Sequence, residues 1–193
     1  MADITKFIPF ILHWASGVNP MKGESAEALF NRAKRTGWCN HPLDRGGATQ
    51  CDVTLATYTH YYKRKRKPAP TKDQLKNITF SEWLEILKGS YWDIWKADHI
   101  LNQSIAHILV DWVWASGAKT IAIAQRIIGV TPDGIVGQQT LTAINESNPS
   151  ALFIQLHNAR IAYVNAIAAR NPSQKIWLKG WLNRINAITY KSA

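Results

Sequence analysis

The sequence predicts a mainly α-helical fold with at most a small β-hairpin. Apolar residues recur at helical spacing near the start of the chain and again over residues 103–116. No segment shows the apolar–polar alternation of a half-buried strand over a useful length, and no internal repeat is visible. A hairpin fits only near the adjacent glycines Gly46 and Gly47. The expected architecture is all-α, or α with a minor β wing.

The first helix is expected over residues 4–16, with Gly17 where such a helix should end. Pro9 is tolerable because it falls in or near the first turn, where its missing N–H needs no partner. The apolar run is short, follows Asp3 and is interrupted by Pro9 and His13, so it reads as part of the mature protein and not as a signal peptide. No segment approaches the ~20 apolar residues that span a bilayer.

Composition indicates a globular protein with an anionic partner. With 46% hydrophobic residues and nine tryptophans, a chain of 193 residues can bury a substantial core. It holds 23 Lys and Arg against 13 Asp and Glu, a formal charge of +10. That balance favours nucleic acid, a membrane surface or a cell-wall polymer, without choosing among them.

The segment Asp44–Thr49 predicts a tight turn suited to a polar ligand. Its adjacent glycines, Gly46 and Gly47, permit positive φ and let a ligand approach backbone N–H groups. Asp44 contributes a carboxylate and Thr49 a hydroxyl on either side of them. Together with the end of the first helix, this turn is a plausible wall of a substrate cleft.

Residues 19–37 separate that helix from the turn, and a short helix is expected from Ser25 to Gly37. Glu24 and Glu27 lie at its start. Negative charge at a helix N-terminus is stabilising, and this is the favoured role for both. The alternative is that one of them supplies an acid to a nearby active site.

A further helix is expected over Val53–Tyr62, followed by the basic run Lys63–Lys67 and the Pro-rich break Pro68–Pro70. Five cations before a break indicate a solvated loop. A nucleic-acid patch is the alternative, but no aromatic interleaving or nucleic-acid motif accompanies the run.

Thr79 and Glu82 form a capping box that should open a helix through Lys88. The aromatic segment Tyr91–Trp95 follows. Its rings suit stacking on pyranose sugars, so Trp92 is a candidate cleft residue; a place in the core is the equal alternative.

The apolar face over Gln103–Ser116 is wide enough for a central, largely buried helix. Asp111 lies on it, and a buried carboxylate demands partners. Asp111 is therefore either a structural anchor, which we favour, or a cleft residue.

The remaining residues predict four more helices. They are expected at 119–128, at 138–145, from Asn148 to Asn171, and after Pro172. Between the first two, Thr131–Gly134 reads as a turn. Its Asp133 and Gly134 belong to a D-G-x-x-G-x-x-T pattern that is similar to peptidoglycan-binding modules.

Cys39 and Cys51 are expected to be free thiols, because two cysteines in a helical chain of this size do not indicate a disulfide framework. No Cys/His spacing suggests zinc, and no metal or cofactor is expected.

Six segments, in order along nearly the whole chain, carry a family resemblance: FIPFILHW (7–14), NHPLDRGGAT (40–49), VTLATY (53–58), YWDIWKAD (91–98), ILVDWVWASG (108–117) and GVTPDGIVGQQTLTAIN (129–145). The chain resembles the lysozyme-like muramidases of glycoside hydrolase family 108, endolysin-type enzymes also described as secretion activator proteins. The resemblance implies a lysozyme-like part over residues 1–100 and a predicted peptidoglycan-binding helical part over residues 101–193, packed as one compact unit.

The resemblance also implies the site. The family's first helix ends in Glu-Gly-Gly, whose Glu is the general acid, whereas this chain has Ala15, Ser16 and Gly17. Asp44 matches the second carboxylate and Thr49 the hydroxyl that positions water. Asp52 is a second departure, since the family usually has Gly there. The implied substrate contacts are Gly46, Gly47, Trp92, Asp133 and Gly134.

These observations predict a protein that recognises peptidoglycan on a muramidase scaffold, with weak or absent lysis. The alternatives are an active N-acetylmuramidase that uses a substitute acid, with Asp52 the nearest candidate, and a DNA-associated basic protein resting on Lys63–Lys67. We expect peptidoglycan strands as the partner, with no nucleic acid and no membrane insertion. Synthesis should be cytoplasmic, so the cell wall would be reached by holin-like export or lysis.

Overall fold

The computed structural model describes residues 1–42 and 46–192. The chain forms two compact units. We call Ile4–Ser90 the N-terminal unit, and Met1–Asp3 together with Tyr91–Ala193 the C-terminal unit. The units meet in the sequence at Ser90–Tyr91, ten residues before the boundary expected at residue 100.

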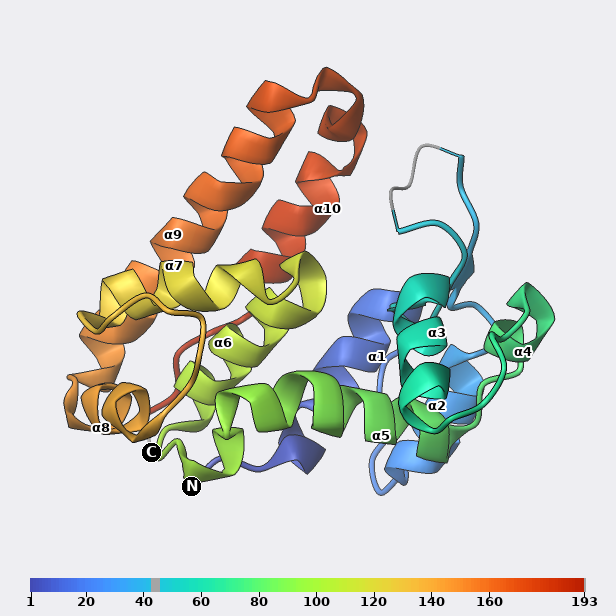
Figure 1. Cartoon of the computed structure of the whole chain (residues 1–193), viewed down its shortest axis with the longest axis horizontal. Coiled ribbons are helices and arrows are strands. Elements are labelled where there is room, and N and C mark those ends of the chain that lie inside the picture. Colours follow the sequence, from blue (N-terminus) through green and yellow to red (C-terminus); the bar gives the residue numbers. More distant parts are fainter. Residues whose placement is uncertain (43–45, 193) are drawn as a thin grey trace. The chain divides into compact units, whose positions relative to one another are not determined.

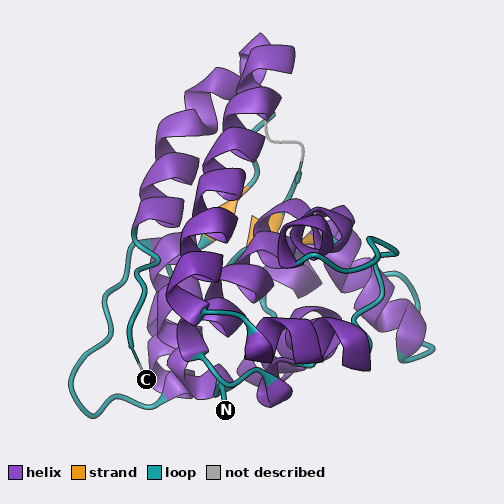
Figure 2. Cartoon of the chain, turned by 90° about the vertical axis from the view of Figure 1, so that its left-hand side faces the viewer, coloured by secondary structure: helices purple, strands orange, loops and turns teal. Residues whose placement is uncertain are grey.

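The N-terminal unit combines short helices (Figure 1) with a small sheet, whose strands are orange in Figure 2. Its helices are η1 (Ile4–Lys6), α1 (Ile8–Ser16), α2 (Ala26–Ala33), α3 (Leu55–Arg64), α4 (Lys72–Lys76) and α5 (Phe80–Leu87). Its strands are β1 (Trp38–Cys39), β2 (Thr49–Gln50) and β3 (Val53–Thr54).

The sheet is antiparallel, in the order β1-β2-β3. Cys39 pairs with Thr49, which also pairs with Thr54. The turn from β2 to β3 consists of Cys51 and Asp52, with φ of 46° and 63°. Two successive positive φ values are the backbone pattern of a two-residue hairpin, whose twist matches that of the strands. The minor β element expected near the glycines is confirmed.

Aromatic rings fill the core of this unit. Phe30 of α2 lies with its ring centroid 5.5 Å from that of Trp83 and 5.6 Å from that of Phe80, both on α5. The Trp83 Nε1–H donates a 3.0 Å hydrogen bond to the Cys51 carbonyl. The core thus holds the hairpin turn against α5.

The C-terminal unit is organised around α6 (Gln103–Ser116), which has the bounds expected from the sequence. Its other helices are η3 (Asp93–Trp95), η4 (Ala97–His99), α7 (Lys119–Ile128), α8 (Gln138–Glu146), α9 (Pro149–Arg170), η5 (Pro172–Gln174) and α10 (Lys175–Asn186). The π-helical turn η2 (Lys88–Trp92) continues α5 and crosses the division between the units. Helices α9 and α10 lie side by side as a hairpin in both views (Figures 1 and 2).

A buried ion cluster joins α6, α9 and α10. Asp111 is fully buried, and its two carboxylate oxygens lie 2.7 Å from Arg160 Nη2 and 2.8 Å from Arg184 Nη2. Burial acts to raise the pKa of Asp111, but the two guanidinium groups outweigh it and lower the pKa. Asp111 is therefore a structural anchor, the favoured interpretation from the sequence.

Several boundaries differ from the expected ones. The first helix is divided into η1 and α1, with Pro9 at the start of α1. Helix α3 begins at Leu55, because Val53 and Thr54 pair in the sheet and the Thr54 hydroxyl caps the helix. The basic run is not simply a loop, since Lys63 and Arg64 form the last turn of α3.

Candidate functional site

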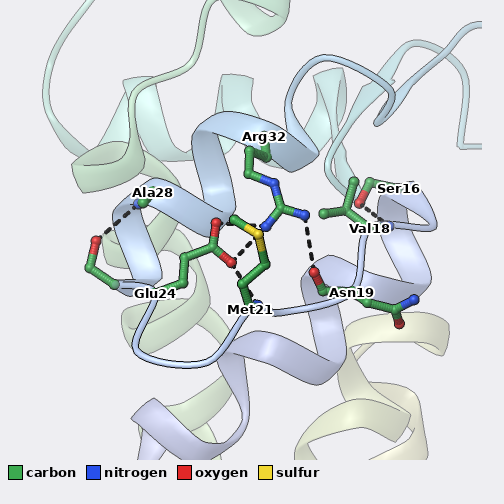
Figure 3. Close-up of polar contacts among 8 residues, drawn as sticks. Ser16, Val18, Asn19, Met21, Glu24, Ala28 and Arg32 are labelled. Carbon is green, nitrogen blue, oxygen red and sulfur yellow. Dashed lines mark hydrogen bonds and ion pairs between the residues drawn. The ribbon is translucent and has the colours of Figure 1, made fainter.

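The end of α1 holds Ala15, the position at which the family resemblance predicts a general acid. Ala15 is half-buried in the last turn, and Gly17 ends the helix with φ of 76°. The Ser16 hydroxyl donates to the Leu12 carbonyl at 2.6 Å. It also accepts from the Val18 N–H at 3.2 Å (Figure 3). The helix end is thus fixed by local hydrogen bonds.

One further contact connects this end to the segment that leads into the sheet. The Thr36 hydroxyl donates a 2.9 Å hydrogen bond to the Ser16 carbonyl. Thr36 lies two residues before β1, and β1 pairs Cys39 with Thr49. The Thr49 hydroxyl, half-buried, donates to the Gly47 carbonyl at 3.0 Å. Its lone pairs remain able to accept a hydrogen bond.

The glycine turn is described only in part. Gly46 is exposed, and Gly47 is half-buried with φ of 66°, which favours glycine. Asp44, the expected second carboxylate, lies outside the described residues. The described part of the site consists of Ala15, Gly46, Gly47 and Thr49.

Glu24 is held in place by an ion pair and is unsuited to be an acid. Its carboxylate accepts from Arg32 Nη1 at 2.7 and 2.8 Å and from the Met21 N–H at 3.0 Å (Figure 3). The Met21 N–H and the Arg32 guanidinium lower the pKa of Glu24. A general acid must be protonated near neutral pH, which requires the opposite shift. Arg32 also donates to the Asn19 carbonyl at 3.1 Å, so the pair fastens the loop after α1 onto α2.

The other two carboxylates considered as acids differ in setting. Glu27 is exposed in the first turn of α2, where its charge suits the helix N-terminus. Asp52 is half-buried in the β2–β3 turn, three residues beyond Thr49.

Trp92 is not a sugar-stacking ring. Its side chain is 0% exposed, and its Nε1–H donates a 2.7 Å hydrogen bond to Asp98. The core alternative is the one observed. The neighbouring Tyr91 is half-buried and makes an edge-on contact with Trp114 of α6, with ring centroids 4.6 Å apart. This pair was not predicted, because in the sequence Trp114 is one more apolar residue of a buried helix.

Asp133 and Gly134 belong to a turn organised by the buried Gln125. The Gln125 Nε2 group donates to Asp133 Oδ1 at 2.9 Å, and its Oε1 accepts from the Gly134 N–H at 2.8 Å. Asp133 also accepts from the Ile135 N–H at 2.8 Å, and these two contacts lower its pKa. The polar atoms expected to bind substrate thus shape the turn itself. The role of Gln125 could have been suspected from the sequence, because this polar residue lies four positions after Ile121 and therefore on the buried face of its helix.

The described residues contain neither a reactive thiolate at Cys51 nor a cluster of metal ligands. Cys39 and Cys51 are free thiols, and burial raises the pKa of Cys51 to about 12, which disfavours the reactive thiolate. Among residues 1–42 and 46–192 no three His, Cys, Asp or Glu side chains gather as a metal site. No helix in those ranges is long and apolar enough to cross a bilayer.

Comparisons with known proteins give a consistent picture. Residues 30–117 match the Glycosyl hydrolase 108 family, and residues 119–186 match the family described as Predicted Peptidoglycan domain. The solved structure of Brucella abortus SagA is similar, with 26% identity and a TM-score of 0.69 over 82% of this chain and 90% of that one. No curated protein matches the chain.

The fold and these matches define a lysozyme-like protein with a peptidoglycan-binding segment. The match of residues 30–117 to glycosyl hydrolase family 108 and of residues 119–186 to the peptidoglycan domain confirms the resemblance that the sequence motifs predicted.

Proposed function

We propose that this chain recognises peptidoglycan glycan strands and that its own lytic activity is weak or absent. The observation that carries the proposal is the end of α1, where Ala15 occupies the position of the family's general acid on a helix end that Thr36 ties to the sheet. Cleavage of a glycosidic bond conventionally needs a carboxyl group to protonate the leaving oxygen. A methyl side chain cannot donate that proton.

The rest of the proposed site serves binding. Gly46 and Gly47 let a glycan approach the backbone, and Thr49 offers a hydroxyl beside them. Asp44 is the proposed second carboxylate, by its match to the family motif. Peptidoglycan also fits the charge of +10, since its peptide stems are acidic.

The competing proposal is an active N-acetylmuramidase with a substitute acid. Glu24 is a poor substitute because its two partners favour the ionised form. Asp52 stays the candidate, since its turn directly continues the strand of Thr49.

The test is clearance of purified peptidoglycan by the wild type and by Ala15→Glu. Ala15→Gln is the matched control, because Gln has nearly the same shape and no ionisable proton. We expect the Glu variant to clear peptidoglycan about 10²–10⁴-fold faster than the wild type and the Gln variant. All three proteins should be retained on insoluble peptidoglycan to the same extent.

Each other outcome has a definite meaning. Clearance by the wild type at the rate of Ala15→Glu would contradict the proposal, and Asp52→Asn would then be the next variant. Failure of the wild type to stay on insoluble peptidoglycan would exclude the binding function. Circular dichroism of each variant checks that the substitution at the half-buried Ala15 leaves the fold intact.

The proposed site of action is the cell wall. The expectations from the sequence, cytoplasmic synthesis and release through holin-like export or lysis, are kept as part of this proposal.

A further inference from the structure

The last part of the sequence has an unusual charge. Residues 147–193 contain no Asp or Glu. They contain six cationic side chains: Arg160, Arg170, Lys175, Lys179, Arg184 and Lys191. Most of this segment forms the hairpin of α9, η5 and α10 (Figure 2).

The base of the hairpin carries a net positive charge. There Arg160 and Arg184 share the single carboxylate of Asp111. His107 lies on the same helix as Asp111, and burial lowers its pKa to about 4, an effect that Asp111 opposes and that Arg160, Arg184 and Lys191 reinforce. The His107 imidazole is therefore neutral near pH 7 and does not change the net charge of this cluster.

The far end of the hairpin is cationic and exposed. Arg170 ends α9, and Lys175 and Lys179 lie on the first two turns of α10; all three side chains are exposed. The connection between the helices is the short η5, so these cations gather around one end of the hairpin.

Apolar side chains reach the surface at the same end. Ile176 is 57% exposed, and the adjacent Trp177 and Leu178 are half-buried, as are Trp181 and Leu182 one turn later. Tryptophan favours the headgroup region of a bilayer, and lysine can lay its aliphatic stem along apolar surface while its charge stays in water. Exposed isoleucine and half-exposed tryptophan between lysines, with no acid nearby in sequence, match helices that lie in a membrane interface.

We propose that the far end of the α9–α10 hairpin, residues 170–182, docks on the surface of an anionic phospholipid bilayer. Charge selects an anionic partner, and Ile176 distinguishes a bilayer from a nucleic acid or wall polymer, because only the bilayer offers an apolar phase. The helix lies on the membrane and does not cross it. The inference does not depend on the proposed site at Ala15 and Thr49 in the N-terminal unit, but its residues lie within the segment 119–186 that matches the Predicted Peptidoglycan domain.

The basic run Lys63–Lys67 is a weaker candidate for the same partner. Lys65 is 2.7 Å from Glu85, and the Lys65 and Lys67 ammonium groups lie 5.6 and 5.2 Å from the ring centroids of Tyr61 and Tyr62. These cations have partners within their own unit, and the run contains no apolar residue.

The experiment is co-sedimentation of the whole chain with vesicles of phosphatidylglycerol and phosphatidylcholine, beside vesicles of phosphatidylcholine alone. We expect binding to the first and little to the second. The double variant Lys175→Gln/Lys179→Gln should lose about thirtyfold in partitioning. Lys63→Gln/Lys72→Gln removes two exposed lysines from the N-terminal unit and should lose much less.

A second pair of variants tests the apolar contact. Ile176→Ser should weaken binding by about tenfold, whereas Ile154→Ser should not. Ile154 is the matched control because it is 56% exposed on α9, about 24 Å along the helix from Arg170. Thermal unfolding of both variants checks that neither loses its fold.

Three results would overturn the inference. They are equal binding to both kinds of vesicle, unchanged binding of the lysine variant, and unchanged binding of Ile176→Ser. In the last case the hairpin would be a general polyanion surface, and heparin would bind equally well to wild type and Ile176→Ser. Retention on insoluble peptidoglycan, measured on the same variants, reports the proposed function separately.

Discussion

Arg160 and Asp111 form a buried ion pair across α9 and α6, with Nη2 of the arginine 2.7 Å from Oδ2 of the carboxylate. The two side chains are 2% and 0% exposed. Arg160 also donates to the Ile108 carbonyl at 3.2 Å, so one side chain of α9 binds both a carboxylate and a backbone carbonyl of the central helix α6. The pair fixes how the hairpin attaches to α6.

Asp111→Asn is expected to destabilise the protein by about 3–5 kcal/mol, because it leaves buried guanidinium charge without a counterion. Urea unfolding measures the loss. Asp73→Asn, at an exposed position on α4, is the control and should change the free energy of unfolding by less than about 0.5 kcal/mol. Equal effects of the two substitutions would contradict the anchoring role.

The pH dependence of stability should fall into two ranges. Since Asp111 has a lowered pKa in the folded state, its contribution is present above its ordinary value of 3.8 and is lost as the pH falls below it. His107 has a folded pKa of about 4 against 6.5 unfolded, so the unfolded state binds more protons between these values. Stability should therefore drop as the pH falls from 6.5 to 4.

His107→Gln is expected to flatten the pH dependence between 6.5 and 4, a range over which His107 accounts for up to about 3 kcal/mol. Chemical unfolding at several pH values measures this. His60→Gln, exposed on α3, should leave the slope unchanged. A slope that persists in His107→Gln would assign the effect to other groups.

Asp52→Gly is expected to stabilise the hairpin by about 1 kcal/mol, because Asp52 has φ of 63° and glycine adopts this conformation without a Cβ clash. Asp52→Asn should be nearly neutral, and Asp52→Ala should destabilise. Thermal unfolding of the three variants gives the order. If Asp52→Gly destabilises the protein most, the Asp52 carboxylate stabilises the fold by more than the positive φ of residue 52 destabilises it.

Gln125→Leu is expected to cost about 2–4 kcal/mol, since the Gly134 N–H loses its acceptor and Asp133 loses one donor. Gln138→Leu is the control, because Gln138 is exposed and its side-chain amide donates a 3.3 Å hydrogen bond to the nearby Thr142 hydroxyl. Urea unfolding compares them. A loss in Gln125→Leu no larger than in Gln138→Leu would show that the turn keeps its shape without the amide.

Much of the fold was predictable because it follows local rules. Helix α6 has its expected bounds since an apolar face at helical spacing and a capping Asn102 mark it directly. The capping box of Thr79 and Glu82 is present as expected. Trp92 could not be placed in this way, because Lys88–Trp95 forms π and 3₁₀ turns, which do not keep the 3.6-residue period. Nor could the role of Glu24, whose partner Arg32 is eight residues away.

The sequence by itself determined the resemblance to glycosyl hydrolase family 108, the mainly helical fold, the absence of a carboxyl group at Ala15 and the lack of acids after Glu146. These depend only on the order of side chains. Tertiary structure alone decided that Asp111 is an anchor, that Trp92 is interior, and that Asp133 and Gly134 serve the turn around Gln125. The physical reason is that burial and hydrogen bonding join residues far apart in the chain, and a side chain's role depends on which partners the fold brings to it.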